Sequence, residues 1–192
     1  MVVYVLYAKA DLQGVASLKT IQGADLCVSV RNPVYQSEVR EKVVIEADEL
    51  IEQEKNDISM VHDKDIRCEP SHHFSLKWDG EKKRSTIRVI DSTLIEVISK
   101  SGKKGKNRNQ GNAGASEVRE MRSNDSGVFV PLLALDCQGI EPFAFHPMGG
   151  EFVVTNKAGD TFDQVDLSEG AWNEFDLATG STAITNFETK FS

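Results

Sequence analysis

The sequence predicts an all-β fold of the barrel or sandwich class, and three observations support it. Apolar and polar residues alternate over short segments rich in β-branched and aromatic residues, as in half-buried strands. Turn-forming residues separate these segments, and short strands divided by turns are typical of barrels and sandwiches. The chain of 192 residues is also long enough to bury a substantial core.

Nine segments carry the strand pattern. They are Val2–Ala10, Leu26–Arg31, Val39–Ile45, His73–Trp78, Ser85–Ile98, Val128–Cys137, Phe143–His146, Glu151–Thr155 and Ala183–Phe191. Residues Asp48–Lys55 have the apolar spacing of a helix instead, although the segment is short for a stable one.

The segment Ser99–Ser126 interrupts this pattern. Its part Ser101–Ser116 has no aliphatic or aromatic side chain larger than alanine, so burial cannot offset the entropy of ordering, and we expect a long flexible linker. It divides the chain into an N-terminal β half (1–98), the linker (99–126) and a C-terminal β half (127–192). Its basic residues fit either a tail for nucleic acid or an acidic partner, or a solvated insertion. We favour the insertion because base-stacking aromatic residues are missing.

The net charge of −8 is unevenly distributed along the chain. Residues 1–125 contain 20 basic and 20 acidic side chains, whereas residues 126–192 contain two lysines and ten acids. Such a surface repels phosphate backbones and membranes and attracts basic partners. We therefore expect a protein partner, and neither nucleic acid nor a membrane. Acids that only keep the surface soluble are the alternative.

The composition also bears on the compartment. Three widely spaced cysteines are an odd number and do not indicate a disulfide framework. No stretch approaches the ~20 apolar residues that span a bilayer. The apolar N-terminus lacks a basic region, so we interpret it as a strand and not as a signal peptide. These features predict a cytoplasmic protein, with the nucleus as a second location.

The C-terminal acids lie among aromatic residues. They do not form an EF-hand loop, because Val165 and Ala171 occupy the positions that need glycine and glutamate. We expect an exposed acidic and aromatic surface that binds a partner. Its candidate residues are Asp163, Asp166, Glu169, Trp172, Phe175 and Asp176. The alternative is that the acids serve turns and caps, with Ser168 starting a helical turn, and that the aromatic residues anchor the segment to the core.

Cysteine and histidine residues lie close together around Cys68. Zinc prefers four nitrogen or sulfur ligands, usually presented as two close pairs, and Cys68 with His72 or His73 would supply one pair. The second pair would require His62 or Cys27, and the spacings C-x-x-C and H-x-x-x-H are absent. We therefore favour a coincidental cluster over a metal site.

Nucleophilic catalysis is not expected. It requires an activated serine or cysteine with a base nearby, and Cys137 followed by His146 is a candidate pair. However, Cys137 ends an apolar run, which favours a buried thiol. The sequence also lacks the G-x-S-x-G, P-loop and G-x-G-x-x-G motifs, so we expect no enzymatic activity.

The C-terminal third carries a specific string of motifs. Asp136-Cys-Gln-Gly-Ile-Glu-Pro142 is followed by Gly159-x-Thr-Phe-x-x-Val-Asp-Leu167 and by Trp172-x-x-Phe-Asp176. With Lys9-Ala-Asp-Leu-Gln-Gly-Val15 near the N-terminus, this string resembles the eukaryotic CXXC-motif-containing zinc-binding protein family. The resemblance implies a mainly antiparallel β protein with two similar, small barrel-like or sandwich-like halves, and no established enzymatic activity.

The resemblance also implies one zinc ion held by two C-x-x-C pairs, and here the chain departs from the family pattern. The second pair would lie at Trp78 and Glu81, and the first at Arg31 and Val34 or, one residue later, at Asn32 and Tyr35. No thiolate stands at any of these positions, and one glutamate cannot hold zinc alone. We expect Trp78, Val34 and Tyr35 to fill the vacated site, with an Arg31–Glu81 ion pair joining the loops. The alternative is that the two loops diverged and no longer meet.

The sequence therefore predicts a non-catalytic binding or scaffold protein without a zinc cofactor, a divergent member of a zinc-binding family. The competing hypothesis is a metal-handling protein with a relocated zinc site at Cys68, His72 and His73.

Overall fold

A computed structural model describes residues 2–51, 71–90, 118–177 and 180–192. The strands in these ranges are β1 (Val2–Gln13), β2 (Val15–Thr20), β3 (Leu26–Arg31), β4 (Val39–Ile45), β5 (Phe74–Leu76), β6 (Ser85–Ile90), β7 (Met121–Arg122), β8 (Val130–Gln138), β9 (Glu141–His146), β10 (Phe152–Asn156), β11 (Thr161–Val165), β12 (Trp172–Asp176) and β13 (Gly180–Phe191). A 3-10 turn, Ser123–Asp125, follows β7. The predicted all-β class is confirmed.

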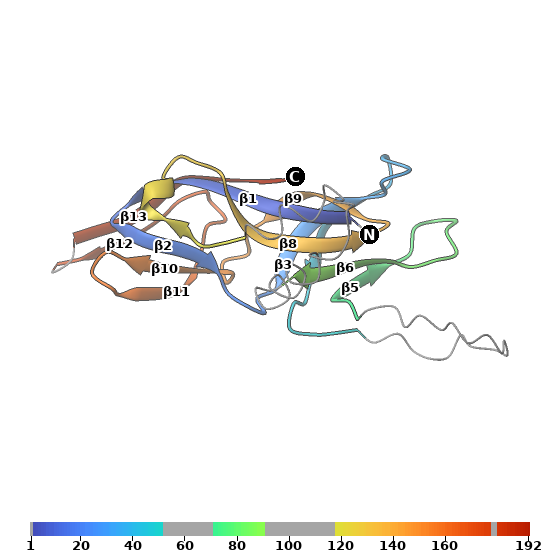
Figure 1. Cartoon of the computed structure of the whole chain (residues 1–192), viewed down its shortest axis with the longest axis horizontal. Helices are drawn as coiled ribbons and strands as arrows, with labels where there is room; N and C mark the ends of the chain where they lie inside the picture. The colour runs from blue at the N-terminus through green and yellow to red at the C-terminus, as the bar shows by residue number, and fades with distance from the viewer. Residues whose placement is uncertain (1, 52–70, 91–117, 178–179) are drawn as a thin grey trace, which may run out of the picture.

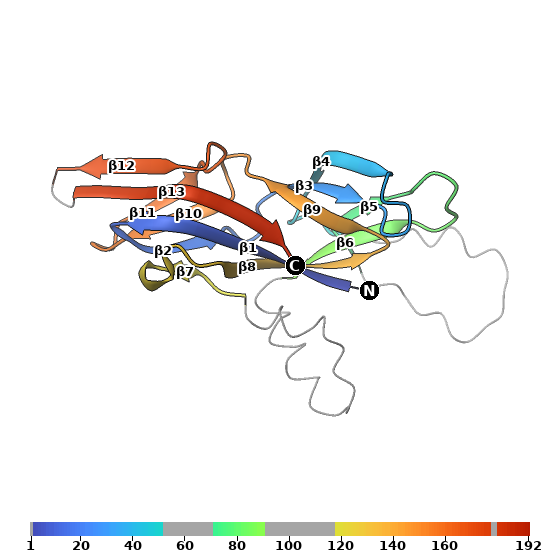
Figure 2. The same ribbon diagram turned by 90° about the horizontal axis from the view of Figure 1, so that it is seen from above.

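The strands form three antiparallel sheets (Figure 1). The largest has the order β12-β13-β1-β8-β6-β5, the second β11-β10-β2-β7, and the third β4-β3-β9. The molecule is elongated, with β10, β11 and β12 toward one end and β3, β4 and β5 toward the other (Figure 2). The long strand β1 runs between the two ends.

Strand pairing does not follow the predicted division of the chain at the linker. β1 pairs with both β8 and β13, β2 pairs with β10, and β3 pairs with β9. Each sheet therefore combines strands from 1–98 with strands from 127–192. The reason is that long-range hydrogen bonds and shared burial decide which strands pair. Local composition, from which the boundary was predicted, does not contain this information.

Gly14 makes the corner at which the chain leaves the largest sheet for the second one. It lies between β1 and β2 with a φ of 69°, and a Cβ atom there would lie 2.5 Å from the carbonyl oxygen of Ser181. Both the positive φ and the close approach require glycine. This residue thus lets β1 and β2, which are consecutive in sequence, belong to different sheets.

The three sheets share one apolar core. Phe152 of β10 is fully buried and makes edge-to-face contacts with Phe145 of β9, at 6.2 Å between ring centroids, and with Phe187 of β13, at 5.3 Å. These rings come from three different sheets, so their contacts tie the sheets together.

Several predicted elements require correction. Strands β2, β11 and β12 are absent from the prediction, and Trp172 lies in β12 where a helical turn was the alternative. In the candidate helix Asp48–Lys55, the described part is a turn followed by a β-bridge at Ile51, and 52–55 lie outside the described residues. Propensity for such a short segment is weak against tertiary pairing.

The predicted linker also ends earlier than expected. Residues 99–117 lie outside the described residues, but β7 and the 3-10 turn fall within Ser99–Ser126. Met121 is fully buried, and the carboxylate of Asp125 accepts hydrogen bonds from Arg119 at 2.7 and 2.8 Å. One apolar anchor and one bidentate ion pair therefore order this segment.

Candidate functional site

Two hairpin loops that are distant in sequence meet at one end of the molecule. The first joins β3 to β4 and begins at Asn32, and the second joins β5 to β6 and contains Trp78 and Glu81. The Nδ2 atom of Asn32 lies 3.4 Å from Oε1 of Glu81, which links the two loops. We call this pair of loops the knuckle region, defined by 32–38 and 77–84.

Asn32 is the central polar residue of the knuckle region, with 1% of its surface exposed. Its Oδ1 atom accepts the backbone N–H groups of Val34, at 2.9 Å, and Tyr35, at 3.3 Å. Its Nδ2 atom donates to Oε2 of Glu38, at 2.9 Å, as well as facing Glu81. A side-chain amide has two acceptor sites and two donor hydrogens, so this environment matches its full capacity.

Trp78, in the second loop, is buried. It is 1% exposed, its indole N–H donates to the carbonyl oxygen of Gly139 at 2.8 Å, and the guanidinium of Arg40 lies 5.5 Å from the ring. The expectation for Val34 and Tyr35 is wrong, because these side chains are 72% and 58% exposed. They lie at the tip of the loop and point away from the core.

The expected Arg31–Glu81 ion pair is also absent. Arg31 pairs with Glu141, its cross-strand neighbour on β9, and this bond raises the pKa of the guanidinium. Its guanidinium also lies 5.7 Å from the ring of Phe143. Arg31 therefore belongs to the sheet, and Asn32 makes the contact between the loops that was expected from Arg31.

The acidic segment forms a different kind of surface. β12 is an edge strand, hydrogen-bonded within the described structure to β13 on one side. Phe175 is 68% exposed, and Leu177 just beyond the strand is 95% exposed. Trp172 is partly buried, with its ring 5.3 Å from that of Phe162.

The six residues predicted for this surface have different roles. Asp163, Glu169, Phe175 and Asp176 are exposed, as a partner surface requires. Asp166 is exposed too, but its Oδ1 atom accepts the N–H of Ser168 at 2.8 Å, and the bonds from Ser168 hold the pKa of this carboxyl below its usual value. Asp166 thus supports a turn, and Trp172 anchors β12 to Phe162.

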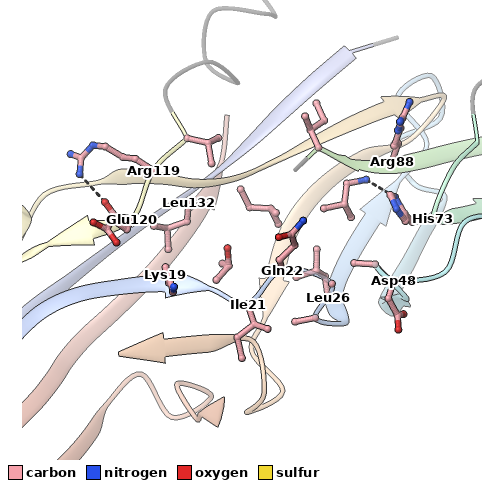
Figure 3. Close-up of a pocket in the computed structure, with 18 of the residues that line it drawn as sticks. Lys19, Ile21, Gln22, Leu26, Asp48, His73, Arg88, Arg119, Glu120 and Leu132 are labelled. Carbon is pink, nitrogen blue, oxygen red and sulfur yellow. Dashed lines mark hydrogen bonds between the residues drawn. The ribbon is translucent and has the colours of Figure 1, made fainter. Parts of the chain in front are cut away.

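A cavity of about 640 Å³ lies where the second sheet meets β6 and β8 (Figure 3). Its lining combines apolar side chains such as Leu26 and Leu132 with Lys19 and Arg119. Arg119 is already held by Asp125, and Nδ1 of His73 accepts the N–H of Val89 at 2.9 Å. The sequence gives no sign of this cavity, because its walls come from segments as distant in the chain as Lys19 and Leu133.

The candidate metal ligands are only partly placed. Cys68 and His62 lie outside the described residues, His72 is buried beside Ile51, and Cys27 is buried on β3 opposite His146. Within the described ranges, no three His, Cys, Asp or Glu side chains cluster closely enough to hold a metal ion.

The candidate nucleophile Cys137 is buried on β8 between Val2 and Ile87, and burial raises the pKa of its thiol well above the usual value. It belongs to a different sheet from His146. Instead, Oγ of Ser29 lies 2.7 Å from Nε2 of His146, a contact that sequence reasoning missed. Among the described residues no carboxylate orients His146, and Ser29 is buried in β3, so an activated nucleophile is not assembled there.

The sequence profile of the family described as "CXXC motif containing zinc binding protein, eukaryotic" matches residues 5–192. The chain belongs to this family. The relative named "UPF0587 protein CG4646" from Drosophila melanogaster is 39% identical over 70 residues, 36% of this chain and 43% of the relative. A "UPF0587 protein" from Dictyostelium discoideum is 31% identical over 120 residues, 62% of this chain and 74% of the relative.

A solved structure shows the same fold. The structure named "Hypothetical protein from plasmodium falciparum" superposes with a TM-score of 0.73 at 18% identity and covers 100% of both chains.

The match to the Drosophila protein spans less than half of that protein, 43% of its length. The described part of this chain contains no helix long and apolar enough to cross a membrane.

The name of the CXXC zinc-binding family raises the question of whether the knuckle region fits zinc. The chain contains no C-x-x-C sequence. The positions that the sequence resemblance assigns to cysteine hold Trp78 and Glu81 for one pair, and Asn32 and Tyr35 or, in the other register, Arg31 and Val34 for the second pair. Zinc in structural sites takes thiolate and imidazole ligands, so these residues do not fit it.

Proposed function

We propose that this chain is a non-catalytic binding protein of the CXXC zinc-binding family, and that it recognises a protein partner through β12 and the acids around it. The observation that carries this proposal is the exposure of Phe175 and Leu177 on and beside an edge strand. Among the described strands, β12 is hydrogen-bonded to β13 alone, and an edge strand offers backbone donors and acceptors to an added strand.

Charge indicates the chemistry of the partner. Glu174 and Asp176 flank Phe175 in the sequence, and both are exposed, as are Asp163 and Glu169. Between residues 126 and 192 only Lys157 and Lys190 oppose ten acids. An extended segment with basic and apolar side chains complements this surface, whereas a phosphate backbone does not.

The test compares partner capture by three forms of the full chain. Phe175→Ser/Leu177→Ser removes the apolar part of the surface. Tyr35→Ser is the matched control, because it removes a similarly exposed aromatic side chain at the other end of the molecule. Quantitative affinity purification should recover proteins that bind the wild type and the control but not the double variant.

Binding to the recovered proteins should also weaken with salt and should map to basic segments that are extended when free. The same recovery from the wild type and from the double variant would reject the proposal. Equal losses from the double variant and from Tyr35→Ser would place the binding surface elsewhere.

A further inference from the structure

The knuckle region raises a question of its own, which does not depend on how β12 is used. In a structural zinc site, the metal joins two loops and thereby supplies folding energy. Here two loops meet whose residues do not fit zinc, so another group must hold them together. The environment of Asn32 shows which group does so.

A group that replaces the metal must contact both loops, and Asn32 does so. Its carbonyl oxygen accepts two successive N–H groups of its own loop, those of Val34 and Tyr35. Its amide nitrogen donates to Glu38 at the far side of the same loop and faces Glu81 in the other loop. The backbone N–H of Asn32 donates to the carbonyl oxygen of Glu38 at 2.9 Å, which closes the loop at its base.

Because Asn32 is buried, the loss of these hydrogen bonds should reduce the stability of the fold. Asn32 is 1% exposed, so water does not replace a partner that is lost, and the N–H groups of Val34 and Tyr35 would lose their acceptor. Trp78 lies in the second loop, and the N–H of Glu81 donates to the carbonyl oxygen of Trp78 at 3.2 Å. The second loop therefore presents Glu81 to Asn32 from a base that is fixed by the buried indole.

We propose that Asn32 is the metal-free junction of the knuckle region: its amide joins the two loops, and no zinc ion is bound between them. Hydrogen bonds and the buried Trp78 then hold both loops without a metal. It follows that the fold of this end of the molecule does not respond to the availability of zinc. The exposed tip at Val34 and Tyr35 is likewise positioned by an amide and not by a metal.

The experiment measures the melting temperature and the amide hydrogen exchange of the full chain, with and without EDTA. The variants are Asn32→Ala and, as a matched control, Asn173→Ala, which changes an exposed asparagine on β12. Glu81→Ala is a milder variant that removes only the contact between the loops.

We expect EDTA to leave the wild-type melting temperature and the exchange of the Val34 and Tyr35 amides unchanged. Asn32→Ala should lower the melting temperature by roughly 5 °C and speed the exchange of both amides, whereas Asn173→Ala should change neither. Glu81→Ala should speed the exchange with a smaller loss of stability, and this variant decides the question if Asn32→Ala does not fold.

Two results would overturn the proposal. One is an acceleration of Val34 and Tyr35 exchange by EDTA in the wild type, which would mean that a metal holds the loop. The other is wild-type exchange at both amides in Asn32→Ala or in Glu81→Ala. If EDTA lowers the melting temperature without affecting these two amides, a metal is bound elsewhere and the junction at Asn32 stands.

Discussion

The two tryptophans of this chain belong to elements toward opposite ends of the molecule, Trp172 to β12 and Trp78 to the loop between β5 and β6 (Figure 2), and they lie in different environments. Trp78, in the knuckle region, is buried and gives its indole N–H to the carbonyl oxygen of Gly139. Trp172, on the edge strand β12, is only partly buried and contacts Phe162. The residues around them differ in the same way, since Asn32 is buried and satisfied whereas Phe175 is exposed.

This difference separates stability from recognition. At the knuckle end, polar groups are buried and paired, so removing one of them should lower the free energy of unfolding. At the β12 end, apolar and acidic groups are exposed, so removing one of them should change the free energy of unfolding little. It should weaken binding where a partner covers that group. Substitutions at the two ends should therefore have different consequences.

The largest effect is expected for Trp78→Ala. Removing a fully buried indole leaves a cavity and an unpaired carbonyl group at Gly139, and should lower the free energy of unfolding by about 3–5 kcal/mol. Urea denaturation followed by circular dichroism measures this loss. A loss below about 1 kcal/mol would mean that the knuckle end is not a packed part of the core.

Trp172→Ala should have a smaller effect. The side chain is partly buried and pairs with Phe162, so we expect a loss of about 1–2 kcal/mol together with weaker partner binding. Phe175→Ala is the control at the same strand, and it should weaken binding without changing the unfolding midpoint. If Trp172→Ala were as costly as Trp78→Ala, Trp172 would be a core residue and the comparison between the two ends would fail.

The smallest effect is expected for substitutions of each tryptophan by phenylalanine, which keep the fold and change only the tryptophan fluorescence. Trp172→Phe leaves Trp78 as the single tryptophan, and Trp78→Phe leaves Trp172. Acrylamide should quench Trp172 more strongly than Trp78, because Trp78 is 1% exposed. Similar quenching of both single-tryptophan variants would contradict the difference in burial on which the comparison rests.

Local pattern predicted some elements well. Strands β3 and β4 have the predicted bounds: β3 is a mainly apolar run with two valines, and β4 has β-branched residues at both of its ends. The edge strand β12 lacks that signal, since four of its five residues are exposed and its sequence has no apolar alternation. Its pairing with β13, and not its composition, makes it a strand.

The candidate sites show the same limit. The sequence alone established that no C-x-x-C pair is present and that the acids concentrate after residue 126. It did not identify Asn32 as the residue between the loops, because a polar residue after a strand is usually a turn residue. The Ser29–His146 contact and the cavity were equally out of reach, since their residues are distant in sequence.

The sequence by itself therefore determined the all-β class, the family resemblance and the ligand types that are missing. These properties depend on residue identity and on local spacing. Only the tertiary structure decided which strands share a sheet and which asparagine is buried. Asn32 and Glu81 lie 49 residues apart, and they meet because β3 and β6 are held in place by β9 and β8, whose positions no local pattern specifies.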